Sequence, residues 1–302
     1  MTYLLFIVGL LGLFFGGEYL VRGASSIARR FGISPLVIGL TIVGFGTSAP
    51  ELLVSVNAAL AGQPAIAIGN VLGSNIANIL LILGVSAVIA PLIIPARRLA
   101  RDLAFMLLAT AVIWVMLLDG VVTRPEGGIL IAGLAVFLFM AFSSGSVPQE
   151  DDPMETSIAK ATLMTLGGLG LLVIGAHFLV DSASTIARTF GISEAVIGLT
   201  IVAVGTSLPE LATSVIAAYR RQTEIAVGNV VGSNIFNIFS ILGITALITP
   251  IPAEARFATI DMPWVAATAV GLTVLAVWLG GLPRVAGVVL LAAYGGYLAL
   301  MG

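Results

Sequence analysis

Two carboxylates stand in matching polar motifs within strongly apolar sequence. Glu51 ends the motif Gly-Thr-Ser-Ala-Pro-Glu at 46–51, and Glu210 ends Gly-Thr-Ser-Leu-Pro-Glu at 205–210. A carboxylate at the centre of a bilayer costs about 2.5–3.5 kcal/mol even on lenient insertion scales, so each needs a partner. Two of them at matching places in the two halves predict one shared site that holds a cation.

A proline directly precedes each glutamate, and a proline breaks a helix because it lacks a backbone N–H and constrains the residue before it. The apolar segments around Pro50 and Pro209 are therefore predicted to be pairs of half-helices, with Glu51 and Glu210 in the first turn of the second half. The helix dipole favours an anion there. Backbone carbonyls released at the end of the first half are predicted cation ligands, at Gly44, Thr47, Ala203 and Thr206.

Oxygen-only ligands suit hard cations such as Ca²⁺ and Na⁺, and suit Mg²⁺ less well because it gives up its water reluctantly. The ligand chemistry leaves Ca²⁺ and Na⁺ open. The residues expected to hold the metal ion, Ca²⁺ on the hypothesis given below, are Glu51, Glu210, Thr47 and Thr206.

A second repeated motif follows each glutamate. It reads Gly-Asn-Val-Leu-Gly-Ser-Asn-Ile-Ala-Asn at 69–78 and Gly-Asn-Val-Val-Gly-Ser-Asn-Ile-Phe-Asn at 228–237. The i, i+4, i+8 spacing places three polar side chains of each copy on one helix stripe. These stripes contain Asn70, Ser74 and Asn78 in the first copy and Asn229, Ser233 and Asn237 in the second.

The composition is that of a multi-pass membrane protein. Of the 302 residues, 59% are hydrophobic and only 9% are charged, with a mean hydropathy of +1.15, whereas soluble domains carry about 25% charged residues. Without cysteine, and with one histidine, the chain can form neither a disulfide nor a multi-histidine metal centre. We expect no cofactor and no nucleic-acid partner, since no basic patch is present.

Apolar runs of about 20 residues predict transmembrane helices. Ten are expected, near 3–27, 34–60, 64–90, 99–118, 127–144, 159–186, 193–219, 224–249, 258–280 and 283–301.

The chain is an internal duplication with a constant offset of 159 residues. Residues 31–52 and 190–211 are identical at 17 of 22 positions, and 66–79 and 225–238 at 11 of 14. Five spans per repeat is an odd number, so the second repeat is predicted to be inverted, an architecture typical of secondary transporters. The predicted fold is all-α, with one five-helix repeat at 1–145, a cytoplasmic linker at 146–157 and the inverted repeat at 158–302.

Basic residues predict the orientation of these helices. The loops after odd-numbered spans collect ten Lys and Arg residues, and the other side collects three. By the positive-inside rule, the first side is cytoplasmic and both termini are extracellular, in the plasma membrane.

These motifs resemble the two repeats of the cation/Ca²⁺ exchanger superfamily, especially its microbial Na⁺/Ca²⁺ exchanger branch. The resemblance covers essentially the whole chain and implies that Glu51 and Glu210 jointly bind Ca²⁺ or Na⁺. It also implies that neighbouring oxygens complete the site. These belong to Thr47, Ser48, Thr206 and Ser207, to the backbone of Gly44 and Ala203, to Ser74 and Ser233, and to Asn78 and Asn237. In the superfamily, K⁺-dependent members have an acidic residue at the position of Asn237. Because this chain has Asn at both of these positions, the resemblance argues against K⁺ dependence.

The resulting hypothesis is a Ca²⁺/cation antiporter that exchanges Na⁺ for Ca²⁺ by alternating access at a site near the bilayer midplane, and acts as a monomer. A H⁺/Ca²⁺ exchanger would use the same glutamates, so the residues alone leave the counter-ion open. A cation channel built on carboxylates is an alternative of a different class. We expect no enzymatic activity, because the chain lacks a Gly-x-Gly-Asp motif and a Ser/His pair within its spans.

Overall fold

The computed structural model describes residues 2–93, 96–143, 157–191 and 203–301, which are helical apart from short loops and four two-residue strands. The α-helices are α1 (Thr2–Phe31), α2 (Pro35–Ile38), α3 (Gly44–Thr47), α4 (Ala49–Leu60), α5 (Pro64–Ala77), α6 (Leu83–Ile89), α7 (Ala96–Met116), α8 (Arg124–Ser143), α9 (Ile158–Thr189), α11 (Ala203–Gly205), α12 (Leu208–Tyr219), α13 (Thr223–Phe236), α14 (Gly243–Ile248), α15 (Met262–Leu279) and α16 (Arg284–Met301). Turns of π-helix cover Gly39–Val43, Asn78–Ile82, Asn237–Leu242 and Phe257–Asp261, and a 3-10 turn covers Leu117–Asp119.

Seven of the ten expected spans are helices long and apolar enough to cross a membrane, among the residues described. An eighth, at 34–60, is a bent pair of helices, Pro35–Thr47 and Ala49–Leu60. The apolar part of α16, Arg284–Leu300, is shorter, and much of the expected span at 193–219 lies outside the described residues. The protein is thus an all-helical, multi-pass membrane protein, while the count of ten spans stays a prediction.

The predicted helix break before Glu51 is confirmed, and it is confined to one residue, Ser48. The two halves meet at an angle of 43°. Ser34 caps the first half by accepting a hydrogen bond from the Val37 N–H at 3.2 Å. Only Ser48 leaves helical geometry (φ −82°, ψ 5°), and α4 begins at Ala49 with Pro50 in its first turn. Glu51 therefore lies at the N-terminal end of a new helix, as predicted.

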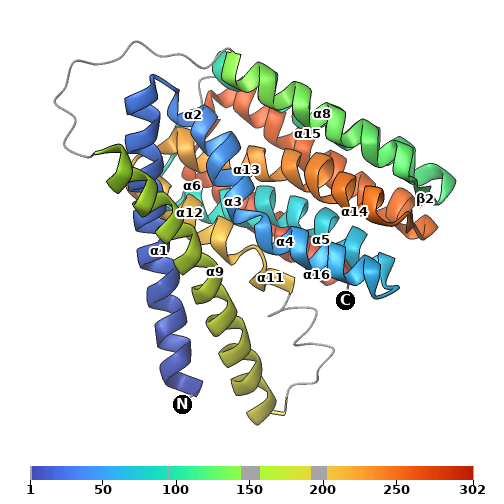
Figure 1. Ribbon diagram of the computed structural model, residues 1–302, viewed down its shortest axis with the longest axis horizontal. Helices are drawn as coiled ribbons and strands as arrows, with labels where there is room; N and C mark the ends of the chain where they lie inside the picture. The colour runs from blue at the N-terminus through green and yellow to red at the C-terminus, as the bar shows by residue number, and fades with distance from the viewer. Residues whose placement is uncertain (1, 94–95, 144–156, 192–202, 302) are drawn as a thin grey trace.

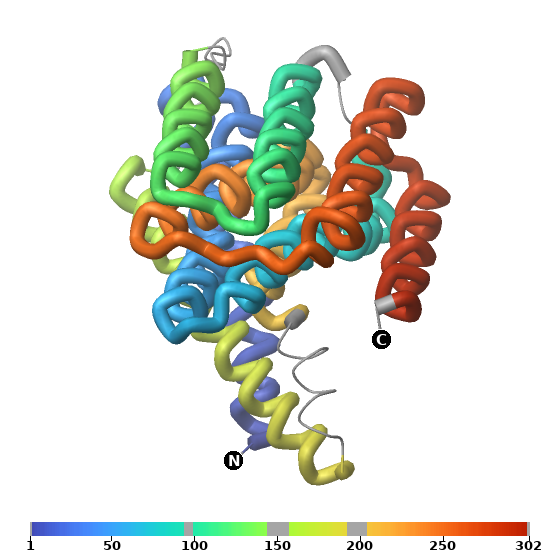
Figure 2. Tube along the Cα trace, turned by 90° about the vertical axis from the view of Figure 1, so that its right-hand side faces the viewer, coloured from blue at the N-terminus to red at the C-terminus, as the bar shows by residue number. Residues whose placement is uncertain are grey.

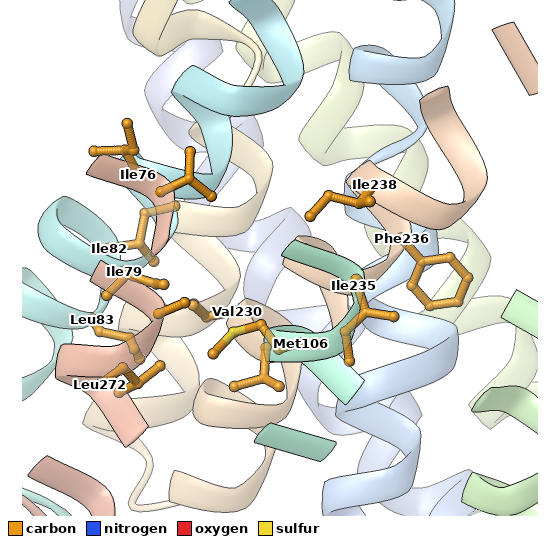
Figure 3. Packing of buried hydrophobic residues seen from close by; sticks show 14 of the residues in the cluster. Ile76, Ile79, Ile82, Leu83, Met106, Val230, Ile235, Phe236, Ile238 and Leu272 are labelled. Atoms are coloured by element: carbon orange, nitrogen blue, oxygen red, sulfur yellow. The ribbon is translucent and has the colours of Figure 1, made fainter. Parts of the chain in front are cut away.

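The motif-bearing helices form the centre of the molecule. Within the apolar 18-residue stretch of each span, 72% of the residues are buried in Pro64–Ile89 and 83% in Thr223–Ile248, whereas at most 33% are buried in the spans formed by α1, α8 and α9. Apolar side chains from the π-helical turn Asn78–Ile82 and from α7, α13 and α15 pack together between them, as Figure 3 shows for Ile79, Met106, Val230 and Leu272. Polar motifs are consequently held inside the best-packed part of the protein.

Helices α1 and α9 lie side by side and project from the rest of the molecule (Figures 1 and 2). Glycines bring their backbones together: a Cβ on Gly168 would lie 2.5 Å from the Leu20 nitrogen and 2.7 Å from the Gly16 carbonyl oxygen. Gly9 and Gly175 make an equally close approach further along the pair. Small residues permit such contacts between membrane helices.

Polar contacts tie α1 to the C-terminal end of α12. Glu18 forms ion pairs with Arg22 and with Arg220. About two turns after Glu18 on α1, the Ser25 hydroxyl donates a hydrogen bond of 2.6 Å to the Gln222 side-chain oxygen.

The short strands join the two halves of the chain. β1 (Leu92–Ile93) pairs antiparallel with β4 (Gly281–Leu282), and β2 (Val121–Val122) pairs antiparallel with β3 (Ile251–Pro252). In each pair one strand comes from the first repeat and one from the second, so the repeats form a single folded unit.

Candidate cation-binding site

The two carboxylates lie in one crossed arrangement between the halves. The Ser48 hydroxyl donates a hydrogen bond to Glu210 Oε1 at 3.1 Å, and the Ser207 hydroxyl donates to Glu51 Oε1 at 3.4 Å. Each serine lies three residues before the glutamate of its own repeat, so each half holds the carboxylate of the other. Glu51 and Glu210 are both only 1% exposed.

A matching pair of asparagines fixes the helices that carry the glutamates. Asn70 Nδ2 donates to the Glu51 backbone carbonyl at 3.1 Å and to the Ser55 hydroxyl at 2.9 Å. The equivalent Asn229 makes the same two contacts in the second half, to Glu210 and Ser214, at 3.2 and 2.9 Å. Asn70 and Asn229 therefore position the carboxylate-bearing turns through the backbone, rather than facing the carboxylates.

The serines of the second motif lie next to the first motif of the opposite half. Ser207 Oγ lies 3.4 Å from Ser74 Oγ, so Ser74 joins the group around Glu51. Ser233 donates to the Gly44 carbonyl at 3.3 Å. The Thr47 hydroxyl contacts Asn229 Oδ1 at 3.1 Å.

The expectation that the helix break releases the Gly44 carbonyl is wrong for this structure. That oxygen accepts from the Ser48 N–H at 3.2 Å, and from the hydroxyls of Thr47 and Ser233 at 3.3 Å each. Gly46 and Thr47 remain helical, so Gly44 keeps its donor four residues on. The carbonyl that loses such a donor is that of Gly46, because Pro50 has no N–H.

Asn78 and Asn237 directly follow α5 and α13, at the start of the π-helical turns Asn78–Ile82 and Asn237–Leu242, and are each 1% exposed. Their Nδ2 atoms donate across the repeats, from Asn78 to Asn234 Oδ1 and from Asn237 to Asn75 Oδ1, at 2.9 Å in both cases. Asn75 and Asn234 were not among the expected site residues. They occupy the repeated Gly-Ser-Asn-Ile motif, three residues before Asn78 and Asn237, and this i, i+3 spacing was the signal available in the sequence.

Two predicted residues of the second half lie at the edge of the described chain. Ala203 begins the short helix α11, directly after the undescribed residues 192–202. Thr206 follows α11 and its hydroxyl is buried.

Several buried oxygens of this group have no hydrogen-bond partner among the described residues. They are Glu51 Oε2, Glu210 Oε2, Asn78 Oδ1, Asn237 Oδ1 and Thr206 Oγ1. Neither glutamate forms an ion pair within the described part of the chain. Buried carboxylates are costly without a counter-charge, and carboxylate, amide and hydroxyl oxygens are the ligands of hard cations. The residues present thus fit a small cation.

The described residues contain no group of three or more His, Cys, Asp or Glu side chains suited to a metal ion. A cation at this position would therefore depend on two carboxylates supplemented by neutral oxygens, which gives the site a charge of −2 when both are ionised.

A family model described as "Sodium/calcium exchanger protein" matches residues 1–143 and 160–302. The chain belongs to the sodium/calcium exchanger family. Relatives of this exchanger-family chain include the putative antiporter CaxA of Alkalimonas amylolytica, 41% identical over 98% of this chain and 97% of the relative. Sodium/calcium exchanger MaX1 of Methanosarcina acetivorans is 32% identical over 99% and 98%.

Solved structures agree with this assignment. The sodium-calcium exchanger NCX_Mj, in crystals soaked without Na⁺ and Ca²⁺, superposes with a TM-score of 0.89 at 34% identity, over 100% of this chain and 99% of that one. At this identity and coverage, the exchanger-family chain shares the fold of NCX_Mj along its whole length. Family members are transporters.

Proposed function

We propose that the protein is a Na⁺/Ca²⁺ antiporter whose two cations compete for the oxygens around Glu51 and Glu210. The observation that carries this proposal is the crossed pair of buried carboxylates, each held by a serine of the other repeat, at 3.1 and 3.4 Å. One Ca²⁺ neutralises two carboxylates, and several Na⁺ ions can take its place. Both loads do not fit together, which makes exchange obligatory.

Two relatives support Na⁺ over H⁺ as the counter-ion, because MaX1 and NCX_Mj are both sodium/calcium exchangers. A proton needs only a carboxylate oxygen, and an amide oxygen does not titrate in the physiological range. The buried Oδ1 atoms of Asn78 and Asn237, which have no partner among the described residues, would serve Ca²⁺ and Na⁺ alike and are not needed to bind a proton. Ser74, one helical turn before Asn78, contacts Ser207 beside Glu51, so Asn78 lies on the same face of α5.

Ten helices in two inverted repeats are the architecture that this mechanism requires. We assign residues 1–145 and 158–302 to the repeats and 146–157 to a cytoplasmic linker, with both termini outside the plasma membrane. Reciprocal hydrogen bonds related by the offset of 159 residues support a two-fold relation between the halves: Ser48 donates to Glu210, and Ser207 donates to Glu51. The cation site then lies near the midplane and is complete within one chain, which suits a functional monomer.

In this proposal α1 and α9 move as a pair past the central helices, and this movement opens the site to one side of the membrane at a time. Their glycine contacts make them one body, and they lack the site motifs. The Glu18–Arg220 ion pair and the Ser25–Gln222 hydrogen bond connect α1 to α12, so both must break during such a movement.

Counterflow in proteoliposomes tests the function. Vesicles containing the purified protein are loaded with Na⁺ and diluted into Na⁺-free medium with radioactive Ca²⁺ at equal pH on both sides. Ca²⁺ uptake that requires the Na⁺ gradient is the expected result. Uptake that ignores Na⁺ and follows an imposed pH gradient would instead establish H⁺/Ca²⁺ exchange, and currents with discrete unitary steps would establish a channel.

A further inference from the structure

Four buried asparagines connect the two repeats beside the candidate site. Asn75 and Asn78 come from the first repeat, Asn234 and Asn237 from the second, and none is more than 2% exposed. Every hydrogen bond that their side chains donate to one another crosses from one repeat to the other.

The backbone determines which way the Asn75 amide points. Asn75 contacts the backbone carbonyl of Asn234 at 3.3 Å, and a carbonyl oxygen only accepts hydrogen bonds. Asn75 must therefore present its Nδ2 to that carbonyl, which leaves its Oδ1 facing Asn237. Two acceptor oxygens in contact would repel, so Asn237 must present its Nδ2, as the distance of 2.9 Å to Asn75 Oδ1 reflects.

The same reasoning holds in the other direction. Asn234 Nδ2 contacts the Asn75 backbone carbonyl at 3.4 Å and the Met106 sulfur, also only an acceptor, at 3.9 Å. Asn234 Oδ1 then receives the Nδ2 of Asn78 at 2.9 Å.

The outcome for Asn78 and Asn237 is a fixed orientation. Their Nδ2 atoms donate to the opposite repeat, and their buried Oδ1 atoms have no partner among the residues that the structure describes. An amide turned the other way would direct its partly positive N–H groups at the cation.

We propose that Asn75 and Asn234 are positioning residues, which do not touch the cation but force Asn237 and Asn78 to present oxygen to it. This inference rests on the proposed function. Its consequence is that ion affinity depends on a contact between repeats, so that each half sets the ligand orientation of the other.

The first test removes the orienting acceptor with Asn75→Ala. The Asn237 amide is then free to turn, and we expect the half-saturating Ca²⁺ concentration to rise by about 10- to 100-fold, as for other residues that orient metal ligands. The maximal uptake rate should change far less. Thr245→Val is the matched control, because it removes a buried hydroxyl of α14 that has no partner in the described part of the chain, and it should leave both values unchanged.

A rescue separates positioning from packing. A carboxylate presents oxygen whichever way it turns, so Asn237→Asp no longer needs the acceptor on Asn75. In the parent, the same substitution sets a carboxylate against Asn75 Oδ1. We therefore expect Asn237→Asp to improve Ca²⁺ affinity at least about fivefold more in the Asn75→Ala background than in the parent, a non-additivity typical of residues in contact.

Equal effects in the two backgrounds, or an unchanged half-saturating concentration in Asn75→Ala, would overturn the inference. If Asn75→Ala does not fold, the cycle is repeated with Asn234→Ala and Asn78→Asp, and failure of both alanine variants to fold would show that the contacts serve packing instead. A parent protein that neither binds nor transports Ca²⁺ would refute the proposed function itself, which is a different result.

Discussion

At the scale of single residues, the proposed function depends on Glu51 and Glu210, and each accepts a hydrogen bond from one serine of the opposite repeat. Loss of either carboxylate should therefore affect a site that both halves share. Their backbone carbonyls are held separately, by Asn70 and Asn229, so neutralising a side chain leaves the supporting contacts in place. The charge of either glutamate side chain can thus be removed without changing the contacts that position its backbone.

Glu51→Gln and Glu210→Gln are expected to lower Ca²⁺ uptake by at least about 30-fold, while the protein still inserts and folds. Glutamine keeps an oxygen for the serine hydroxyl but removes a charge that is buried beside the cation, and such a loss costs about 2–5 kcal/mol. Initial uptake rates in proteoliposomes measure the effect. Glu254→Gln, at an exposed glutamate, is the control and should retain parental uptake. Full transport by either site variant would remove the basis of the account.

The position of a site residue was predictable from the sequence where the local backbone alone determines it. Pro50 and the apolar flanks were enough to place Glu51 in the first turn of a new helix. The amide orientation of Asn78 and Asn237 was not predictable, since it depends on Asn75 and Asn234 of the opposite repeat, and periodicity within one helix does not determine contacts between helices. The prediction of a released Gly44 carbonyl was wrong for a related reason. The sequence does not locate the break at Ser48, and with the break there the Ser48 N–H still donates to Gly44.

At the scale of helices, two glycines of α9 lie in different surroundings. Gly168 is buried against α1, and Gly170 is exposed. On α9, a Cβ on Gly168 would collide with the α1 backbone, whereas a Cβ on Gly170, two residues away, meets no atom of the described residues within 4 Å. The same substitution at the two positions therefore tests the packing alone.

Gly168→Ala should lower the thermal unfolding midpoint of the protein in detergent by several degrees, because overpacking costs about 1–3 kcal/mol. Gly170→Ala should keep or slightly raise the midpoint, since alanine is favoured over glycine inside a helix by about 0.5–1 kcal/mol. Equal midpoints for the two variants would contradict the close approach of α1 and α9.

At the scale of the whole molecule, the account requires the two repeats to run in opposite directions across the membrane. Ala61 and Arg221 follow corresponding helices, α4 and α12, and both are exposed. The absence of cysteine from the chain makes single-cysteine labelling direct.

Ala61→Cys and Arg221→Cys, in separate proteins, are expected to react with a membrane-impermeant thiol reagent from opposite sides of the membrane. In intact cells only Ala61→Cys should be labelled, while Arg221→Cys becomes reactive after permeabilisation. The unaltered cysteine-free chain is the control. Labelling of both positions from one side would refute the inverted arrangement.

The central claim is that Ca²⁺ and Na⁺ compete for one set of oxygens around Glu51 and Glu210. Equilibrium binding of radioactive Ca²⁺ to the purified protein, measured at increasing Na⁺, tests it most directly. The account predicts complete displacement of Ca²⁺, with the apparent Kd rising more than in proportion to the Na⁺ concentration, because more than one Na⁺ replaces each Ca²⁺. Ca²⁺ binding that Na⁺ leaves unchanged, or displaces only in part, would contradict a shared site.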